Sequence, residues 1–524
     1  MRKMNIHLLL HTLLHLTPTQ ILYQIRYRIS KPGYRLYEWK GENAPLHLKP
    51  YIPKPECHTS SGKFVFLNLS NDFSFWSDTS NGMLWAYNLN YMDWLCQKGI
   101  TLEEGIGWID KFIEELPTNR VGLDPYPIAL RGINWIKFIS LHRDEINESK
   151  LVTWNDSLYS QYALLTKKLE YHLLGNHLLE DAYSLYMVAI YFRDKVFYKK
   201  ASCLLRRQLN EQILPDGAHY EQSPMYHCIL LDRLLDCCNL SFNNIFFDGQ
   251  GEFNEYLVHK AEMMLGHLES IVYNDGAIPL LNDSANGIAP SPRQIRDYAS
   301  ELGIRWMAKP MKECGYRKIN GDRFEAIVDI GGIAASYQPG HSHADTFNYE
   351  LRIDGCPFIV DTGISTYNKT FRRQLERSTQ AHNTVTVAGR NSSEVWGGFR
   401  VGDRAKVKVV CDTPGRIEAV HDGFGVHALH RRIFEKPDEG YFKIIDKISS
   451  ASDCKSYIHF APGIKILDCG KSEIRTDKAV ISINGASAVE VISGKVSDEY
   501  NIFHATEIAV LHFSEILEYQ IDIL

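Results

Sequence analysis

The spacing of hydrophobic and polar residues divides the chain into a helical part and a strand-rich part. Up to about residue 310, apolar residues recur three or four positions apart, and Gly, Pro or Asn interrupts the pattern at short intervals. This pattern predicts helices over residues 84–99, 103–116, 126–143, 151–174, 178–214, 224–239 and 252–272.

After Gly315 the pattern changes to short β-rich runs. They predict strands at Phe324–Ile330, Phe347–Ile353, Pro357–Val360, Thr384–Val387, Tyr441–Ile445, Tyr457–Phe460, Val480–Ile483 and Ile508–Phe513. Strands that follow helices as a block, instead of alternating with them, indicate an α+β chain of separately packed units. We therefore predict a helical domain over residues 1–315 and an antiparallel β-sandwich domain over residues 316–524.

The N-terminus needs separate treatment, because Arg2 and Lys3 precede a leucine run in the manner of a secretory signal. Histidines at positions 7, 11 and 15 interrupt that run at helical spacing, and no small-residue cleavage site follows. We expect an amphipathic helix and a cytoplasmic protein. No run of 18 apolar residues occurs, so we expect no transmembrane segment. The basic stretch 23–37 allows two interpretations, peripheral contact with an anionic membrane or ordinary packing.

The composition excludes several classes of protein. A content of 44% apolar and 23% charged residues is that of a globular protein. The net charge of −6, without blocks of like charge, argues against a nucleic-acid partner. The 11 cysteines are scattered and form no C-x-x-C pair, which argues against a disulfide framework or a thiolate zinc site.

The run Gly340-His-Ser-His-Ala-Asp345 is the most unusual local motif. In an extended backbone, residues two apart project to the same side, so His341 and His343 would face one cleft. Asp354-Gly355 then predicts a hairpin turn, which places Asp361 opposite Asn348. A bulge would be needed to bring that carboxylate to the histidines.

His382, in Ala381-His-Asn-Thr384, offers a third imidazole. Two histidines and an aspartate form a suitable set of zinc ligands. A hydrogen-bonded cluster without metal is the alternative interpretation, as is a loop of solvated histidines for the His-x-His pair.

The helical part contributes two further candidates. Ser223 and Pro224 are a typical N-cap and first helical residue, which puts Tyr226 in the first turn. There the positive helix end would favour the phenolate. Asn176 and His177 stand at a helix start, where they would bind an anion or cap the helix. Tyr226 has an alternative role as a packing residue.

These residues, taken in order, resemble the heparinase II/III-type polysaccharide lyases. The resemblance rests on Trp85-Ala-Tyr-Asn-Leu-Asn-Tyr91, Asp124–Arg131 with Asn134-Trp135, Gly175-Asn-His177, Glu221–His227, Gly340–Asp345, Asp361-Thr-Gly363 and Ala381–Thr384. It implies an N-terminal incomplete (α/α) toroid, a C-terminal antiparallel β-sandwich and an active site in the cleft between them.

The resemblance also implies a reaction and roles. Such lyases break the bond to O4 of a uronic acid by β-elimination, after removal of the C5 proton. Asn176 and His177 match the positions that neutralise the substrate carboxylate, and Tyr226 and His341 match the positions of the base and the acid. Which of the two is the base depends on the sugar epimer, and one tyrosine can serve both roles. His343, Asp361 and His382 match the metal positions, which implies a zinc ion that organises the site. The substrate-binding positions are matched by Arg131, Asn134, Trp135 and Tyr91, and Arg377 is a further candidate for binding the uronate.

We therefore expect a lyase acting on an acidic polysaccharide or oligosaccharide, in bacterial capsule, lipopolysaccharide or exopolysaccharide metabolism. A uronyl C5-epimerase is the first alternative, because it abstracts the same proton. A non-catalytic glycan-binding protein is the second. The sequence does not specify the glycan, endo or exo action, or the oligomeric state.

Overall fold

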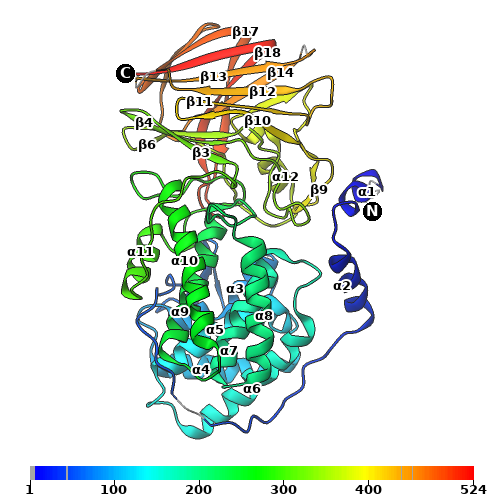
Figure 1. Cartoon of the computed structure of the whole chain (residues 1–524), viewed down its shortest axis with the longest axis vertical. Coiled ribbons are helices and arrows are strands. Elements are labelled where there is room, and N and C mark those ends of the chain that lie inside the picture. The colour runs from blue at the N-terminus through cyan, green and yellow to red at the C-terminus, as the bar shows by residue number, and fades with distance from the viewer. Residues whose placement is uncertain (1–5, 43–44, 438–439, 451–452) are drawn as a thin grey trace.

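The computed structural model describes residues 6–42, 45–437, 440–450 and 453–524. Figure 1 shows an elongated molecule with a helical half and a strand-rich half stacked end to end. Two N-terminal helices, α1 (Ile6–Leu13) and α2 (Pro18–Ile29), lie along one side of both halves. The helix expected at the N-terminus is therefore present, although Arg2 and Lys3 lie outside the described residues.

The helical half is a series of helices that pack against one another. Helix α5 packs against α6 and α7, α7 packs against α8, and α9 packs against α10. Its helices are α3 (Met83–Tyr91), α4 (Leu102–Glu115), α5 (Pro125–Leu141), α6 (Glu148–Lys168), α7 (Gly175–Tyr191), α8 (Lys195–Gln212), α9 (Pro224–Asn243), α10 (Gln250–Ile271) and α11 (Pro292–Glu301). A short hairpin of β1 (Lys63–Phe66) and β2 (Leu69–Asp72) precedes α3.

The strand-rich half is a sandwich of two antiparallel sheets. The smaller has the order β3-β4-β5-β6, with β3 (Tyr316–Asn320), β4 (Phe324–Asp329), β5 (Tyr349–Ile353) and β6 (Cys356–Ile359). The larger has the order β10-β11-β12-β13-β18-β17-β16-β15, and β14 pairs with both β18 and β7. Its strands are β7 (Val385–Val387), β10 (Val407–Thr413), β11 (Arg416–His421), β12 (His430–Glu435), β13 (Tyr441–Ile448), β14 (Cys454–His459), β15 (Ile466–Cys469), β16 (Glu473–Thr476), β17 (Ala479–Val496) and β18 (His504–Ile523).

Each half has its own hydrophobic core. The core of the helical half contains fully buried tryptophans such as Trp135 and Trp154. The core of the sandwich joins side chains of the small sheet, such as Leu351, to those of the large sheet, such as Phe442. The fold class expected from the sequence, a toroid followed by a β-sandwich, is therefore confirmed.

Local signals account for several element boundaries. The Ser223 hydroxyl accepts the N–H of Tyr226 and caps α9, with Pro224 as first residue, as predicted. The single helix expected over 178–214 is instead two helices. Arg193 has a φ of 51°, and the Asp194 side chain caps α8, so the chain turns between α7 and α8.

The hairpin of β5 and β6 has the predicted turn. Asp354 and Gly355 have φ values of 49° and 76°, as a tight turn of this kind requires. The register shifts between Leu351 and Arg352, so the hairpin contains a bulge. The Asn348 amide donates to the Asp361 carboxylate at 2.5 Å, and Asp361 also lies 2.7 Å from His382 Nδ1, whereas His343 bonds to Asp283 instead.

The connection between the two halves is fastened to the helical half. Asp216, in the loop after α8, accepts the backbone N–H of Lys312 at 3.0 Å and of Cys314 at 2.9 Å. His267 on α10 completes a buried group with Asp216 and Cys314. Among the described residues, no helix combines the length and hydropathy that crossing a bilayer requires.

Candidate active site

Tyr226 and His341 meet where the two halves touch. Tyr226 stands in the first turn of α9, and His341 stands in the loop between β4 and β5. Their ring centroids are 3.9 Å apart. A second phenol, Tyr367, has its hydroxyl 3.3 Å from the Tyr226 hydroxyl and 3.3 Å from His341 Nδ1. The helical half therefore supplies one phenol, and the strand-rich half supplies an imidazole and a second phenol.

Asn176 joins this group from the start of α7. Its side-chain amide lies 3.1 Å from His341 Nε2 and donates to a Glu221 carboxylate oxygen at 2.9 Å. The other Glu221 oxygen accepts the backbone N–H of Asn176 at 2.8 Å. Glu221 therefore accepts a backbone N–H at the start of α7 and orients the Asn176 amide toward His341. Both Asn176 and Glu221 are buried.

His177 follows Asn176 and lies on a more exposed wall of the site. Its side chain is 30% exposed, and its Nδ1 is 3.1 Å from a Glu170 carboxylate oxygen. Burial alone would lower the pKa of His177, but the Glu170 carboxylate outweighs burial and raises it. Tyr126 lies against the His177 ring, and Tyr91 lies against Tyr126. This wall is thus aromatic, with one imidazole that favours the charged form.

Asp283 is the residue on which the strand side of the site converges. Its carboxylate lies 3.0 Å from His341 Nδ1 and 2.8 Å from His343 Nε2. Arg373 binds both of its oxygens, at 2.5 and 2.7 Å. Burial would raise the pKa of Asp283, yet Arg373 and the two histidines hold it well below its usual range. Asp283 is therefore ionised and orients both histidines.

The electrostatics of Tyr226 differ from the sequence-based expectation. The helix start was expected to favour the phenolate, whereas burial, with Asp283 and Glu221 nearby, raises the pKa of Tyr226 well above its usual value. The correction has a simple cause. A helix terminus carries about half a charge, and at this position it does not outweigh burial beside two carboxylates. The Tyr226 hydroxyl is therefore protonated.

The sequence reasoning missed Asp283, Glu221 and Tyr367 as members of the site. Asp283 follows Asn282, which has a φ of 55°, in a loop without regular structure. A polar pair in an apolar stretch, Leu280-Leu-Asn-Asp-Ser284, was the available signal. Glu221 stands in a fragment already recognised as unusual. Nothing in the sequence around Tyr367 marks it.

Two family models match consecutive parts of the chain. The model described as Heparinase II/III N-terminus matches residues 131–302, and the model described as Heparinase II/III-like, C-terminal matches residues 303–523. The chain belongs to the heparinase II/III-like family.

Curated relatives agree with this assignment at low identity. A heparin-sulfate lyase of Bacteroides stercoris is 20% identical over 323 residues, which are 55% of this chain and 46% of that protein. One of Pedobacter heparinus is 23% identical over 245 residues, or 41% of this chain and 36% of that protein. The matched segments thus span less than half of these relatives.

Solved structures show the same fold. Heparan sulfate lyase HepC from Pedobacter heparinus has a TM-score of 0.58 at 16% identity, covering 96% of this chain and 87% of that one. A structure titled heparinase III has a TM-score of 0.63 at 14% identity, covering 97% and 89%. The heparinase II/III-like chain therefore shares the fold of these proteins along nearly its whole length.

The metal ligands implied by the family are His343, Asp361 and His382, all buried. His382 Nδ1 is 2.7 Å from Asp361, and His343 Nε2 is bonded to Asp283, so one nitrogen of each ring is held by a carboxylate. The other two nitrogens, His343 Nδ1 and His382 Nε2, are buried without a hydrogen-bond partner. The rings are 5.3 Å apart. The two histidines therefore fit a zinc ion in donor type and in free nitrogens, whereas Asp361 bonds the opposite nitrogen of His382.

The spacing of this set is wider than that of a compact site. Within the described ranges, the groups of three whose ligand atoms lie within 4.8 Å of one another are His7-His11-Glu394 and Asp216-His267-Cys314. A further unpartnered atom, Asp345 Oδ2, belongs to a carboxyl group that interacts electrostatically with His382. Burial raises the pKa of Asp345 to about 6.

Four of the expected substrate-binding residues are packed inside the protein. Arg131 is fully buried and donates to Gln161 and to the carbonyls of Asn90 and Gly122. Asn134 donates to the Tyr91 carbonyl and to Asp93. The structure thus gives these two residues the task of joining α5 to its neighbours, in place of substrate contact.

Trp135 and Arg377 are also fully buried. The Trp135 indole N–H points to the sulfur of Met92, and Arg377 donates to the Ser342 carbonyl next to His341. Arg377 therefore supports the His341 loop from behind. Tyr91 is buried as well, and its ring lies against Tyr126 at the aromatic wall of the site.

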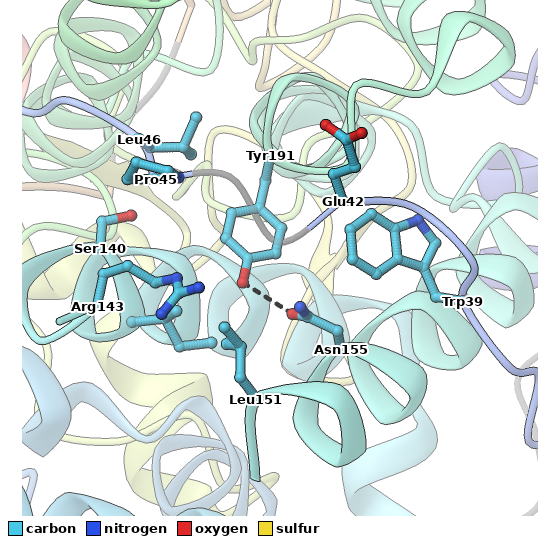
Figure 2. Close-up of a pocket in the computed structure, with 10 residues that line it drawn as sticks. Trp39, Glu42, Pro45, Leu46, Ser140, Arg143, Leu151, Asn155 and Tyr191 are labelled. Carbon is cyan, nitrogen blue, oxygen red and sulfur yellow. Dashed lines mark hydrogen bonds between the residues drawn. The ribbon is translucent and has the colours of Figure 1, made fainter. Parts of the chain in front are cut away.

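Figure 2 shows a pocket elsewhere in the helical half, lined by Trp39, Tyr191 and Asn155 among others. The Tyr191 hydroxyl donates to Asn155 at 2.8 Å. The pocket holds about 10 Å³, which is the space of about one water molecule. It is too small for a sugar ring, and it contains none of the candidate site residues.

Proposed function

We propose that the protein is a polysaccharide lyase that cleaves the bond to O4 of a uronic acid by β-elimination. The observation that carries this proposal is the cluster at the contact of the two halves. There the ring centroids of Tyr226 and His341 are 3.9 Å apart, and the Asn176 amide lies 3.1 Å from the same imidazole. An acid, a base and a neutral donor for a carboxylate are the groups that this elimination requires.

Charge neutralisation is the first requirement, because removing the C5 proton places negative charge on the sugar carboxylate. The Asn176 amide, fixed by Glu221, is a preorganised donor for one carboxylate oxygen. His177 supplies a positive charge next to it, because Glu170 raises its pKa. Both residues face the sugar from the helical half in this proposal.

His341 is the better candidate for the base. Its Nδ1 donates to the ionised Asp283 at 3.0 Å, which leaves Nε2 as the nitrogen that accepts a proton. Asn176 lies 3.1 Å from Nε2 and donates to it in the absence of substrate. The negative charge of Asp283 stabilises the imidazolium that forms, as in other acid-base pairs of this kind.

Tyr226 is then the acid that protonates the departing O4. Burial keeps its hydroxyl protonated, so it holds the proton that the leaving group needs. The Tyr367 hydroxyl, 3.3 Å away, offers a second donor. The side chains of Tyr226, Tyr367 and His177 are each partly exposed, and in this proposal the sugar contacts them from that side.

We also propose a zinc ion between His343, Asp361 and His382. When bound, the ion would neutralise the buried carboxylate and hold the two imidazoles in place. The protein residues that act on the sugar in this proposal are Asn176, His177, Tyr226 and His341. The acidic glycan is proposed as the substrate because the matched relatives are named heparin-sulfate lyases.

The reaction is tested by incubating the protein in heavy water with a panel of uronate-containing glycans that includes heparan sulfate. Ultraviolet absorbance from a new C4–C5 double bond supports the lyase. Deuterium at C5 without that absorbance assigns a C5-epimerase and overturns elimination. Absence of both signals across the panel overturns catalysis and favours a glycan-binding protein.

The active residue is tested with a pair of matched tyrosine variants. Tyr226→Phe removes the proposed acid, and we expect a loss of kcat of roughly a hundredfold or more. Tyr191→Phe removes a half-buried hydroxyl that bonds Asn155 outside the site, and its activity should match that of the unmodified protein. Equal rates for the two variants would refute the role of Tyr226.

A further inference from the structure

Helix α2 is attached to the protein through its polar side chains. Gln20 is buried and donates to the Leu173 carbonyl in the helical half and to the Tyr337 carbonyl in the strand-rich half, both at 3.2 Å. The Tyr27 hydroxyl donates to the Leu169 carbonyl, and Tyr23 packs on Tyr171 with ring centroids 4.6 Å apart. Gln20, Tyr23 and Tyr27 therefore define the inner face of α2.

The outer face of α2 is aliphatic. Ile21, Leu22, Ile25 and Ile29 are spaced so that they share one side of the helix, opposite to the inner face. All four are exposed, Leu22 by 62% and Ile29 by 81%. This orientation is the reverse of an ordinary surface helix, which turns its aliphatic side toward the core.

Helix α1 likewise contacts the strand-rich half through polar side chains and leaves its leucines exposed. The indole N–H of Trp396 donates to the Thr12 hydroxyl at 3.1 Å, and His11 lies 2.8 Å from an Asp403 carboxylate oxygen. Leu10, Leu13 and Leu14 are exposed, Leu14 by 82%. In Figure 1, α1 and α2 follow one another along the same side of the molecule.

The charge of this segment differs from that of the remaining protein. Residues 1–37 contain no Asp or Glu and six basic residues, Arg2, Lys3, Arg26, Arg28, Lys31 and Arg35. The remaining chain has 51 basic and 63 acidic residues, out of totals of 57 and 63. A positive segment on a negative protein is drawn to an anionic surface, while the rest of the protein is repelled by it.

We propose that α1 and α2 form a docking surface for an anionic phospholipid bilayer. The seven exposed aliphatic side chains enter the boundary between headgroups and acyl chains, and the arginines that flank them pair with lipid phosphates. A second copy of the chain fits less well. In a symmetric dimer the same patch meets itself, so its basic residues face like charges.

Vesicle co-sedimentation of the full chain tests this proposal. We expect binding to vesicles of equal parts phosphatidylcholine and phosphatidylglycerol, weaker binding at high salt, and weak binding to phosphatidylcholine alone. Leu22→Ser with Ile25→Ser should lower the partition coefficient by roughly tenfold or more. Arg26→Gln should lower it by roughly fivefold on the anionic vesicles alone.

The matched control is Val196→Ser on α8, an aliphatic side chain that is 75% exposed outside the segment. It should bind vesicles as the unmodified protein does. The proposal is overturned if the Leu22/Ile25 double variant binds as well as the unmodified protein, or if the unmodified protein binds no vesicles. It is also overturned if the unmodified protein binds neutral and anionic vesicles equally. A stable dimer in solution that the double variant dissociates would overturn it too, and would assign the surface to a second copy.

Discussion

A single buried carboxylate, Asp283, determines the state of the residues around it. It accepts hydrogen bonds from two histidines and a bidentate arginine, and the arginine keeps it ionised in spite of burial. His341 lies on the side of Asp283 proposed to bind the sugar, and His343 lies on the side proposed to bind the metal. Asp283 thus couples the proposed base to the proposed zinc site.

Asp283→Asn tests this coupling. The amide keeps the shape of the carboxylate but removes the charge that stabilises a protonated His341, so kcat should fall on the order of a thousandfold. Arg373 would lose its buried counterion, which costs about 3–5 kcal/mol of unfolding free energy. Steady-state kinetics and urea unfolding measure the two effects. A variant with unchanged kcat would show that Asp283 does not act through His341.

His382→Ala tests the proposed zinc site. The substitution removes one of the two unpartnered nitrogens, and elemental analysis of the purified protein should then show less than half of the metal of the unmodified protein. Its thermal unfolding should also lose its response to added chelator. His504→Ala, which alters a half-exposed histidine elsewhere on the sandwich, is the control. Equal metal content in both variants would contradict the site.

At the scale of elements, α10 contributes a buried neutral histidine to the connection between the halves. Burial lowers the pKa of His267 to about 4, although Asp216 opposes this. The unfolded chain, with an ordinary histidine, therefore binds the proton more readily than the folded chain between that pH and about 6.5. Stability from this residue is present at neutral pH and is lost as the pH falls through that window.

His267→Asn should reduce this pH dependence. Between about pH 7 and about pH 5, the unmodified protein should lose about 2 kcal/mol more unfolding free energy than the variant. Urea unfolding at the two pH values measures the difference. Parallel losses in both proteins would mean that His267 is protonated, or solvated, in the folded state.

Elements with a local signal were predictable, and elements defined by distant contacts were not. Ser223-Pro224 and Asp354-Gly355 fix a helix start and a turn by their own chemistry. The strands β10, β11 and β12 were not predicted. In β10 most side chains are exposed, although Val407, Val409 and Val410 are residues typical of strands.

The same distinction applies to the candidate site. His341 and Tyr226 were found because motifs mark them, whereas Asp283 and Tyr367 join through the fold. Arg131 and Trp135 show the opposite failure. Both were predicted to contact the substrate because they match family positions. Both side chains are fully buried, so their role here is packing. Sequence alone does not separate a buried guanidinium with internal acceptors from one that binds a ligand.

At the scale of the whole molecule, the arrangement of the two halves is what creates the site. The helical half supplies Asn176 and Tyr226, and the strand-rich half supplies His341 and Tyr367. The connection held by Asp216 and the double attachment of Gln20 both fasten the halves to each other. Activity therefore requires the intact chain in this account.

The most direct test of the shared site is a double-mutant cycle between its two halves. The substrate is the glycan that gives the strongest absorbance change, and kcat is measured for Tyr226→Phe, His341→Ala and the double variant. If both residues act on one sugar as a unit, the double variant should be about as slow as the slower single variant. Losses that multiply would show independent roles and contradict a common active site.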